Sequence, residues 1–441
     1  MNARRVCGLI PPCLLFLACA QGESTNGGPA VRDSAGVEIV ENGRAGAWGP
    51  APATVEEVVR IGVAEGADHL QFYRILSLDV AADGTIYAGN DQTGTVRAFT
   101  ADGTFLREFG GKGRGPGEYI MVNRVWMAGD SVVITDWQSG GRNGVYSRDG
   151  QLVAFWPSAQ IGGGRVSPMA LTPYGWVASY SPPYRPPAVA PGEKWAQRGA
   201  LVRFDPGSAT MGDTLFLTPP RVLYGSPETE GMDWALFDPP VPFDFDAAGR
   251  IYLSHGEPYR IEVHEPILDP AARNEAGAFR LARIITRAID AVPIMETDIE
   301  RLKERVSEFY DTMTTRDPES RSAERERVIR RIDNQRGFNP RPHLPPLRRL
   351  LVSHDGSFWI ERADIASPAD LEFERLFGGF GRGQPRATRW DLYDGEGRFL
   401  AQVDLHPRFT PHAVRGPEIT GVLKDELDIE FVVTYRVISP S

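Results

Sequence analysis

Cysteine is almost absent from this chain. The 441 residues contain three, Cys7, Cys13 and Cys19, and all of them lie at the N-terminal end. The rest of the sequence therefore cannot form a disulfide framework or a cysteine-ligated metal site. Its stability must come from the burial of apolar side chains and from backbone pairing.

An excess of positive charge is also lacking. The formal net charge is -10, and it becomes two units more negative if Arg4 and Arg5 are removed with a leader. Such a balance argues against nucleic acid, or an anionic membrane surface, as the main partner. We therefore expect no nucleic-acid binding.

Long uncharged apolar runs are missing except at the N-terminus. Arg4 and Arg5 precede an apolar run from Val6 to Ala20, which is the layout of a secretory signal and is too short for a comfortable membrane span. Leu17-Ala18-Cys19 resembles the end of a lipobox, whereas Ala18-Cys19-Ala20 also fits ordinary signal cleavage. We predict a leader over 1–20, lipidation of Cys19 and a flexible tether over 21–36. The expected location is periplasmic or attached to the outer membrane, with a soluble exported protein as the alternative.

Motifs for covalent or zinc chemistry are missing as well. The chain has no Gly-x-Ser-x-Gly elbow and no His-Glu-x-x-His motif. Ser353-His354-Asp355 holds the residue types of a triad, but neighbouring side chains on a strand face opposite ways, and the last two belong to a turn. The glycine-rich loop from Gly110 to Gly117, which contains Lys112 and Arg114, lacks the context of a phosphate-binding loop. We interpret it as a structural turn.

The sequence is instead rich in turn residues, with 47 glycines and 36 prolines, and it repeats itself. Phe109-Gly110 lies 48 residues after Ile61-Gly62, and Tyr119 lies 47 residues after Phe72. This spacing is close to the length of one β-propeller blade. Glycine-containing turns that precede apolar and aromatic strands, such as Asp83-Gly84 before Ile86, indicate a short antiparallel meander in each unit.

Six such units can be counted, and the last is one strand short. We predict that Thr54–Ile61 supplies the missing strand and closes the ring. Helical spacing in Glu296–Asp333, with Thr297-Asp298-Ile299-Glu300 as a capping box, predicts an insertion over about 293–342 between the fourth and fifth units. The predicted fold is an all-β, six-bladed propeller of four-stranded antiparallel blades over 37–441. The units span Arg74–Phe109, Met121–Pro157, Arg165–Leu217, Pro242–Arg287, His343–Leu405 and Phe409–Ile438.

These residues resemble a known family. The segment from Phe109 to Tyr119 is similar to the connection between blades in NHL-type propellers and in related bacterial six-bladed propeller lipoproteins. Tyr259-Arg260-Ile261-Glu262-Val263 resembles their Arg-Ile-x-Val strand, and Ile134-Thr135-Asp136 resembles a strand that ends in aspartate. Thr95 stands where the family usually has arginine. The resemblance implies the fold, but propellers of this type include binding scaffolds, lyases and lactonases.

Polar residues that follow the apolar strands are the candidate site. In a propeller they could meet near one rim of the central channel, where oxygen ligands would favour Ca²⁺ over a thiolate-bound metal. The alternative is that they cap strand ends. The favoured function is non-enzymatic binding of a protein, peptide or glycan by a monomer, and the alternative is a metal-dependent lyase or gluconolactonase-like hydrolase. The candidates are Asn90, Asp91, Asp136, His255 and Glu361.

Overall fold

The structure is a computed structural model in which residues 28–439 are described, apart from several short stretches. The stretches left out are 139–140, 158–164, 182–189, 209, 227–231, 234, 238–240, 255–257, 270, 272–277, 315–316, 338–341, 364–365 and 378–387.

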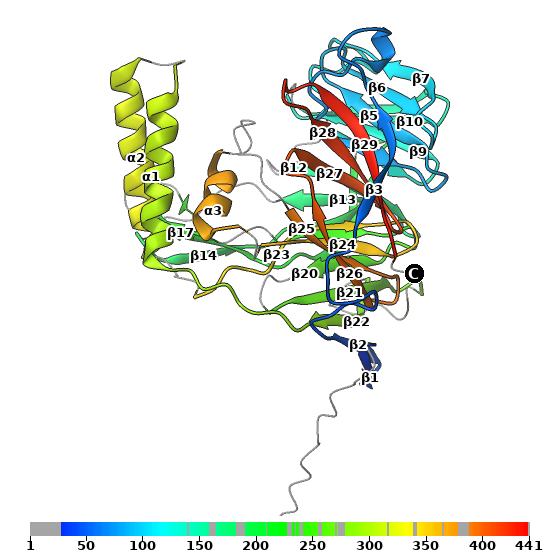
Figure 1. Ribbon diagram of the computed structural model, residues 1–441. Helices are drawn as coiled ribbons and strands as arrows, with labels where there is room; N and C mark the ends of the chain where they lie inside the picture. The colour runs from blue at the N-terminus through cyan, green and yellow to red at the C-terminus, as the bar shows by residue number, and fades with distance from the viewer. Residues whose placement is uncertain are drawn as a thin grey trace, which may run out of the picture.

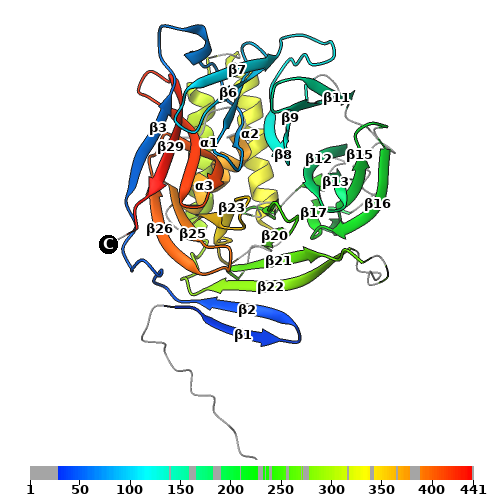
Figure 2. The ribbon, with the colours of Figure 1, turned by 90° about the vertical axis from the view of Figure 1, so that its right-hand side faces the viewer.

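Six antiparallel blades are arranged in a ring, which confirms the predicted six-bladed propeller (Figure 2). Each blade has four strands, which run from the innermost strand next to the axis to the outermost. Blade 1 holds β4 (Leu78–Val80), β5 (Ile86–Asn90), β6 (Thr95–Phe99) and β7 (Phe105–Gly110). Blade 2 holds β8 (Arg124–Ala128), β9 (Ser131–Asp136), β10 (Arg142–Ser147) and β11 (Leu152–Pro157). Blade 3 holds β12 (Arg165–Thr172), β13 (Gly175–Ser181), β15 (Ala200–Asp205) and β16 (Thr210–Leu217). Blade 4 holds β19 (Phe243–Phe245), β20 (Ile251–Ser254), β21 (Arg260–Pro266) and β22 (Phe279–Arg287). Blade 5 holds β23 (Leu347–Val352), β24 (Phe358–Arg362), β25 (Thr388–Tyr393) and β26 (Phe399–Leu405).

Blade 6 joins the two ends of the chain. It contains β27 (Phe409–Arg415), β28 (Glu418–Lys424) and β29 (Glu430–Val437), and its outermost strand is β3 (Val55–Ile61). In this antiparallel pairing Val433 lies opposite Arg60, and Thr434 lies opposite Val59. The predicted closure is therefore confirmed, and it covers the edge of β29 that would otherwise be open.

Many of the turns between strands contain a glycine with a positive φ. Gly84 has a φ of +89°, and a Cβ at this position would lie 2.8 Å from the Cβ of Ala101 in the neighbouring hairpin. A side chain is thus excluded by the backbone conformation and by the space available. These tight turns place β4 beside β5 and allow the blades to stack through their apolar faces.

The N-terminal part of the described chain follows the outside of the ring. Part of the segment predicted as a tether, Ala30–Ser34, is strand β1, which pairs with β2 (Val37–Asn42), and β2 adds in parallel to β22 of blade 4. Val40 is buried there, and Asn42 donates to the carbonyls of Thr286 at 3.1 Å and Gly397 at 3.0 Å. The tether prediction, made from polar composition, missed β1, which pairs with the adjacent strand β2. Strand β2 in turn pairs with β22, more than 240 residues away in the sequence.

The predicted insertion is present between blades 4 and 5 as two helices, α1 (Glu296–Thr312) and α2 (Pro318–Arg336). The predicted capping box is displaced, because α1 begins at Glu296 and the Asp298 carboxylate accepts from the backbone N–H of Met295 at 2.8 Å. At the other end, Arg321 Nη1 donates to the Met313 carbonyl at 2.6 Å and so holds the start of α2 against the end of α1.

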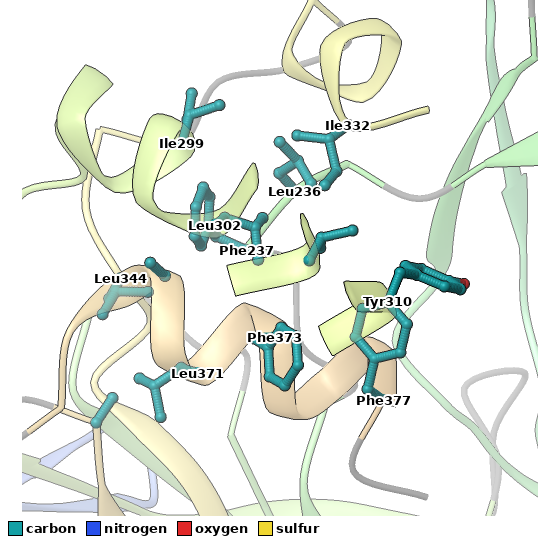
Figure 3. Packing of buried hydrophobic residues seen from close by; sticks show 13 residues of the cluster. Leu236, Phe237, Ile299, Leu302, Tyr310, Ile332, Leu344, Leu371, Phe373 and Phe377 are labelled. Carbon is teal, nitrogen blue, oxygen red and sulfur yellow. The ribbon is translucent and has the colours of Figure 1, made fainter. Parts of the chain in front are cut away.

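A third helix, α3 (Pro368–Phe377), was not predicted and lies between β24 and β25 of blade 5. It packs with α1 and α2 around a separate hydrophobic core (Figure 3). Arg305 of α1 also pairs with Asp370 of α3. The buried members of this core are Leu236, Phe237, Ile299, Leu302, Val306, Tyr310, Ile332, Leu344, Ala363, Ala369, Leu371, Phe373 and Phe377.

The two faces of the ring differ. The helices lie on one side of the propeller together with a small sheet of β14 (Lys194–Gln197), β17 (Arg221–Gly225) and β18 (Met232–Asp233), as Figure 1 shows. The small sheet comes from the connection between β13 and β15 and from the one between blades 3 and 4. The helices come from the connection between blades 4 and 5 and from the one between β24 and β25 within blade 5. We call this side the insertion face. The opposite side, the turn face, carries tight hairpins such as those at Gly103, Gly150 and Gly397.

Candidate functional site on the insertion face and the axis

Two of the predicted site residues, Asn90 and Asp91, end β5 and are buried. Asn90 Oδ1 accepts from the backbone N–H of Tyr73 at 3.0 Å. Asp91 forms an ion pair with Arg74, and its other oxygen accepts from the N–H of Val122 at 3.3 Å. Both side chains therefore use their acceptors to hold the connections that enter blades 1 and 2.

The third predicted residue, Asp136, ends β9 and is fully buried. Its Oδ2 accepts from the N–H of Ile120 at 2.7 Å and from that of Met121 at 3.4 Å, and its Oδ1 accepts from the N–H of Gln138 at 2.7 Å. Three amide donors compensate the desolvated carboxylate. Asp136 therefore fixes two neighbouring segments of the insertion face.

The remaining predicted residues lie elsewhere. Glu361 ends β24 and accepts from Arg348 Nη1 at 3.0 Å, while Arg349 Nε lies 4.0 Å from its other oxygen. His255 and Cys19 lie outside the described residues. Each predicted side chain that is described is thus engaged by its own blade or by a connection to the adjacent one. In the described part of the chain, no three His, Cys, Asp or Glu residues lie close enough together to hold a metal ion.

Charged residues that sequence reasoning missed lie on the innermost strands. Asp79 of β4 and Asp244 of β19 each accept from a backbone N–H of the next blade, Met127 at 2.7 Å and Val352 at 3.0 Å. Arg124 of β8 interacts electrostatically with both carboxylates. A signal existed in the repeats, because Leu78-Asp79-Val80 and Phe243-Asp244-Phe245 occupy the same place before their turns, opposite Tyr87 and Tyr252 respectively.

Desolvation dominates the protonation of this axial group. Burial raises the pKa of Asp244 to about 6, against the lowering effect of hydrogen bonds from Val352 and Phe245 and of the charge of Arg124. Burial also raises the pKa of Asp79 and lowers that of Arg124. Blades 1, 2 and 4 thus bring two carboxylates and one guanidinium into a shared low-dielectric environment at the axis.

A second axial pair comes from blades 5 and 6. Arg349 of β23 donates from Nη2 to the Pro411 carbonyl at 2.6 Å. The Arg349 side chain is 38% exposed. Burial and the charge of Arg349 lower the pKa of His412 on β27 to about 3. His412 is therefore neutral at physiological pH.

A pocket of about 400 Å³ opens on the insertion face of blade 2. Arg114 and Ile120 come from the connection between blades 1 and 2, and Gln138 and Arg142 come from the end of β9 and the start of β10. Lys112 of the same glycine-rich loop is engaged, because its Nζ donates to the carbonyls of Asp91 and Ile120, each at 2.7 Å. The loop is the structural connection that was predicted, yet it presents Arg114 to a pocket.

Comparisons with known proteins give no family for this chain. No family model matches it, and no curated protein matches. Among solved structures, a member of the DUF4221 family from Bacteroides vulgatus has 8% identity and a TM-score of 0.48, over 88% of this chain and 100% of that one. A streptogramin B lyase has 9% identity and a TM-score of 0.37, over 88% and 98%. The PQQ-bound aldose sugar dehydrogenase of Streptomyces coelicolor has 11% identity and a TM-score of 0.36, over 88% and 100%. At these values no activity transfers to this chain.

Among the residues that the structure describes, no helix is long and apolar enough to cross a bilayer.

Proposed function

We propose that this protein is a binding module that recognises a partner through its insertion face. The observation that carries the proposal is the asymmetry of the ring: all three helices and the β14-β17-β18 sheet lie on one face. Loops of minimal length would suffice to connect the blades, and long additions to a rigid scaffold are where binding residues usually lie. The partner is a protein, a peptide or a glycan.

An exported, lipid-anchored monomer is the form in which we propose that it acts. The support is the leader pattern of residues 1–20, which places Cys19 at a lipobox-like site. Mass spectrometry of the mature N-terminus would detect a diacylglyceryl-modified Cys19 as the first residue. An unmodified chain beginning at Gln21 would contradict the anchor.

The alternative function is a metal-dependent lyase or lactone hydrolase that uses the channel. It requires a bound ion, and the described residues contain no cluster of three His, Cys, Asp or Glu side chains that could hold one. Metal analysis of the purified protein, together with lactone hydrolysis and elimination assays, tests this directly. A stoichiometric ion on which turnover depends would replace the binding function by the enzymatic one.

The face that binds can be identified by blocking each face in turn. Without its leader the chain has no cysteine, so single cysteines can be labelled with maleimide-polyethylene glycol at Glu65 and Glu193 on the insertion face, and at Asp130 and Glu396 on the turn face. All four side chains are exposed. Binding to glycan and peptide arrays should be lost with labels at Glu65→Cys and Glu193→Cys only. Loss with the turn-face labels alone, or no binding to either array, would overturn the proposal.

A further inference from the structure

The pocket on blade 2 is built from two segments that one buried carboxylate holds together. Asp136 accepts from the backbone of Ile120 on one side and of Gln138 on the other, both at 2.7 Å, and both of these residues line the pocket. Asn123 Oδ1 similarly accepts from the N–H of Trp137 at 2.7 Å. The pocket wall is therefore positioned before any ligand arrives, which lowers the entropic cost of binding.

Its charge is positive although the protein as a whole is acidic. Arg114 is exposed, and Arg142 donates only a long hydrogen bond of 3.4 Å, to the Gly115 carbonyl. In the described part of the chain neither guanidinium has a carboxylate oxygen within 4.0 Å. The nearby carboxylates are engaged otherwise, Asp136 by three amides and Glu118 by the N–H of Gly115 at 2.7 Å. Two available guanidiniums favour a carboxylate, which arginine binds with parallel hydrogen bonds.

Other groups around the pocket suit a sugar ring. Gln138 offers an amide that can both donate to and accept from hydroxyl groups, and Ile120 offers an apolar wall. A volume of about 400 Å³ lies in the range of small-ligand sites.

We infer that this pocket binds the carboxylate of an acidic saccharide, a uronic-acid unit of a larger glycan. The inference rests on the proposed binding function and names its ligand class. An acidic peptide would also satisfy the arginines, but peptides are usually held along an exposed strand edge or an apolar groove. The pocket instead provides two guanidiniums, one amide and one isoleucine.

Isothermal titration calorimetry with digalacturonate tests the inference, because this probe carries the charge on a pyranose ring. Its neutral methyl ester and a tetraglutamate peptide serve as comparison ligands. Arg114→Gln and Arg142→Gln should each weaken digalacturonate binding about 10- to 100-fold, as expected for loss of a hydrogen bond between charged groups. Arg398→Gln, which removes an arginine from the turn face, should leave the affinity unchanged.

The possible outcomes separate this inference from the proposed function. The inference is supported if the two pocket variants, but not the Arg398→Gln control, lose affinity for digalacturonate, and if the parent protein binds the methyl ester at least tenfold more weakly than digalacturonate. Binding of digalacturonate that both pocket variants retain overturns it while the binding function stands. Preference for tetraglutamate overturns the saccharide assignment in the same way. If no array ligand and no calorimetric probe binds the protein, both the inference and the proposed function fail. Circular dichroism confirms that each variant is folded.

Discussion

Asp79 in the innermost strand of blade 1 accepts a 2.7 Å hydrogen bond from the backbone N–H of Met127 in the innermost strand of blade 2. Asp244 makes the equivalent contact from blade 4 to Val352 of blade 5 at 3.0 Å. An aspartate thus ties each of these blades to its neighbour close to the axis. Between blades 1 and 2, Ser77 adds a hydrogen bond from the N–H of Val125 at 3.0 Å.

The Asp79→Ala variant should be less stable than the parent protein by about 1–3 kcal/mol, because the amide of Met127 loses its acceptor in a buried place. Asp79→Asn keeps an acceptor oxygen and should lose less. Urea unfolding followed by far-ultraviolet circular dichroism measures both. The exposed turn variant Asp130→Ala serves as control, and an equal loss there would show that the contact between the blades is not responsible.

Asp244 makes stability depend on pH. Burial raises its pKa to about 6 in the folded protein, above the ordinary value of 3.8. Its favourable contribution is therefore complete below about pH 4 and is lost as the pH rises through about 6. At neutral pH the ionised group costs up to about 3 kcal/mol at 1.36 kcal/mol per pKa unit. Relative to the parent, Asp244→Asn should gain stability between pH 4.5 and 7.5 in urea unfolding. If the difference in free energy of unfolding between the two proteins did not change with pH, the raised pKa of Asp244 would be contradicted.

His412 should act in the opposite direction. Its folded pKa of about 3 lies below the ordinary value of 6.5, so its contribution to stability is present above pH 6.5 and declines as the pH falls towards 3. In a nuclear magnetic resonance titration, one of the seven histidine ring signals should stay at its neutral position from pH 8 to 4.5. The His412→Asn variant assigns that signal. Titration of the assigned signal near pH 6.5 would show that the ring is solvated.

Ring closure can be tested by shortening the N-terminus in two steps. A chain that begins at Val37 lacks only β1, whose residues are all exposed, and should lose about 1 kcal/mol or less. A chain that begins at Gly62 lacks both β2 and β3 and leaves the edges of β22 and β29 open, so it should aggregate. Size-exclusion chromatography and thermal unfolding distinguish the two. A soluble, cooperatively unfolding product of the second deletion would refute closure by β3.

Asp136 should control the pocket without touching the ligand. Asp136→Ala removes the acceptor that positions Ile120 and Gln138, and should weaken digalacturonate binding about tenfold while the protein loses about 1–3 kcal/mol of stability. Asp136→Asn keeps one acceptor and should recover part of both losses. Calorimetry and urea unfolding on the same samples give the two values. Unchanged affinity in a destabilised Asp136→Ala protein would limit this residue to a purely structural role.

Much of the fold could be predicted because its determinants are local. The turn at Asp83-Gly84 needs a backbone conformation that glycine adopts freely, and the strands on either side alternate in the pattern of a meander. Repetition of this unit implied stacking, and the one-strand deficit of the last unit implied the partner strand Val55–Ile61. Strand β1 was missed because its polar residues resemble a linker, although it pairs with the adjacent strand β2. Helix α3 was missed because it is stabilised by packing against α1 and α2, which are distant in the sequence.

The candidate site was predicted less well, for a related reason. Asn90, Asp91, Asp136 and Glu361 were recognised by their place at strand ends, and each proved to be bonded to its own or the adjacent blade. The pocket residues Arg114 and Arg142 carry no shared motif and are 28 positions apart in the chain. Tertiary hydrogen bonds, those of Asp136 foremost among them, bring their segments together.

The sequence by itself determined the number of blades, their order and the strand that completes the ring, since these follow from turn chemistry and alternation that each repeat contains within itself. The tertiary structure alone decided which charges meet at the axis and which arginines face a pocket. Side chains such as Asp79, Arg124 and Asp244 come from different blades. Their distances are set by how the sheets stack around the axis, and no local pattern of residues encodes that arrangement.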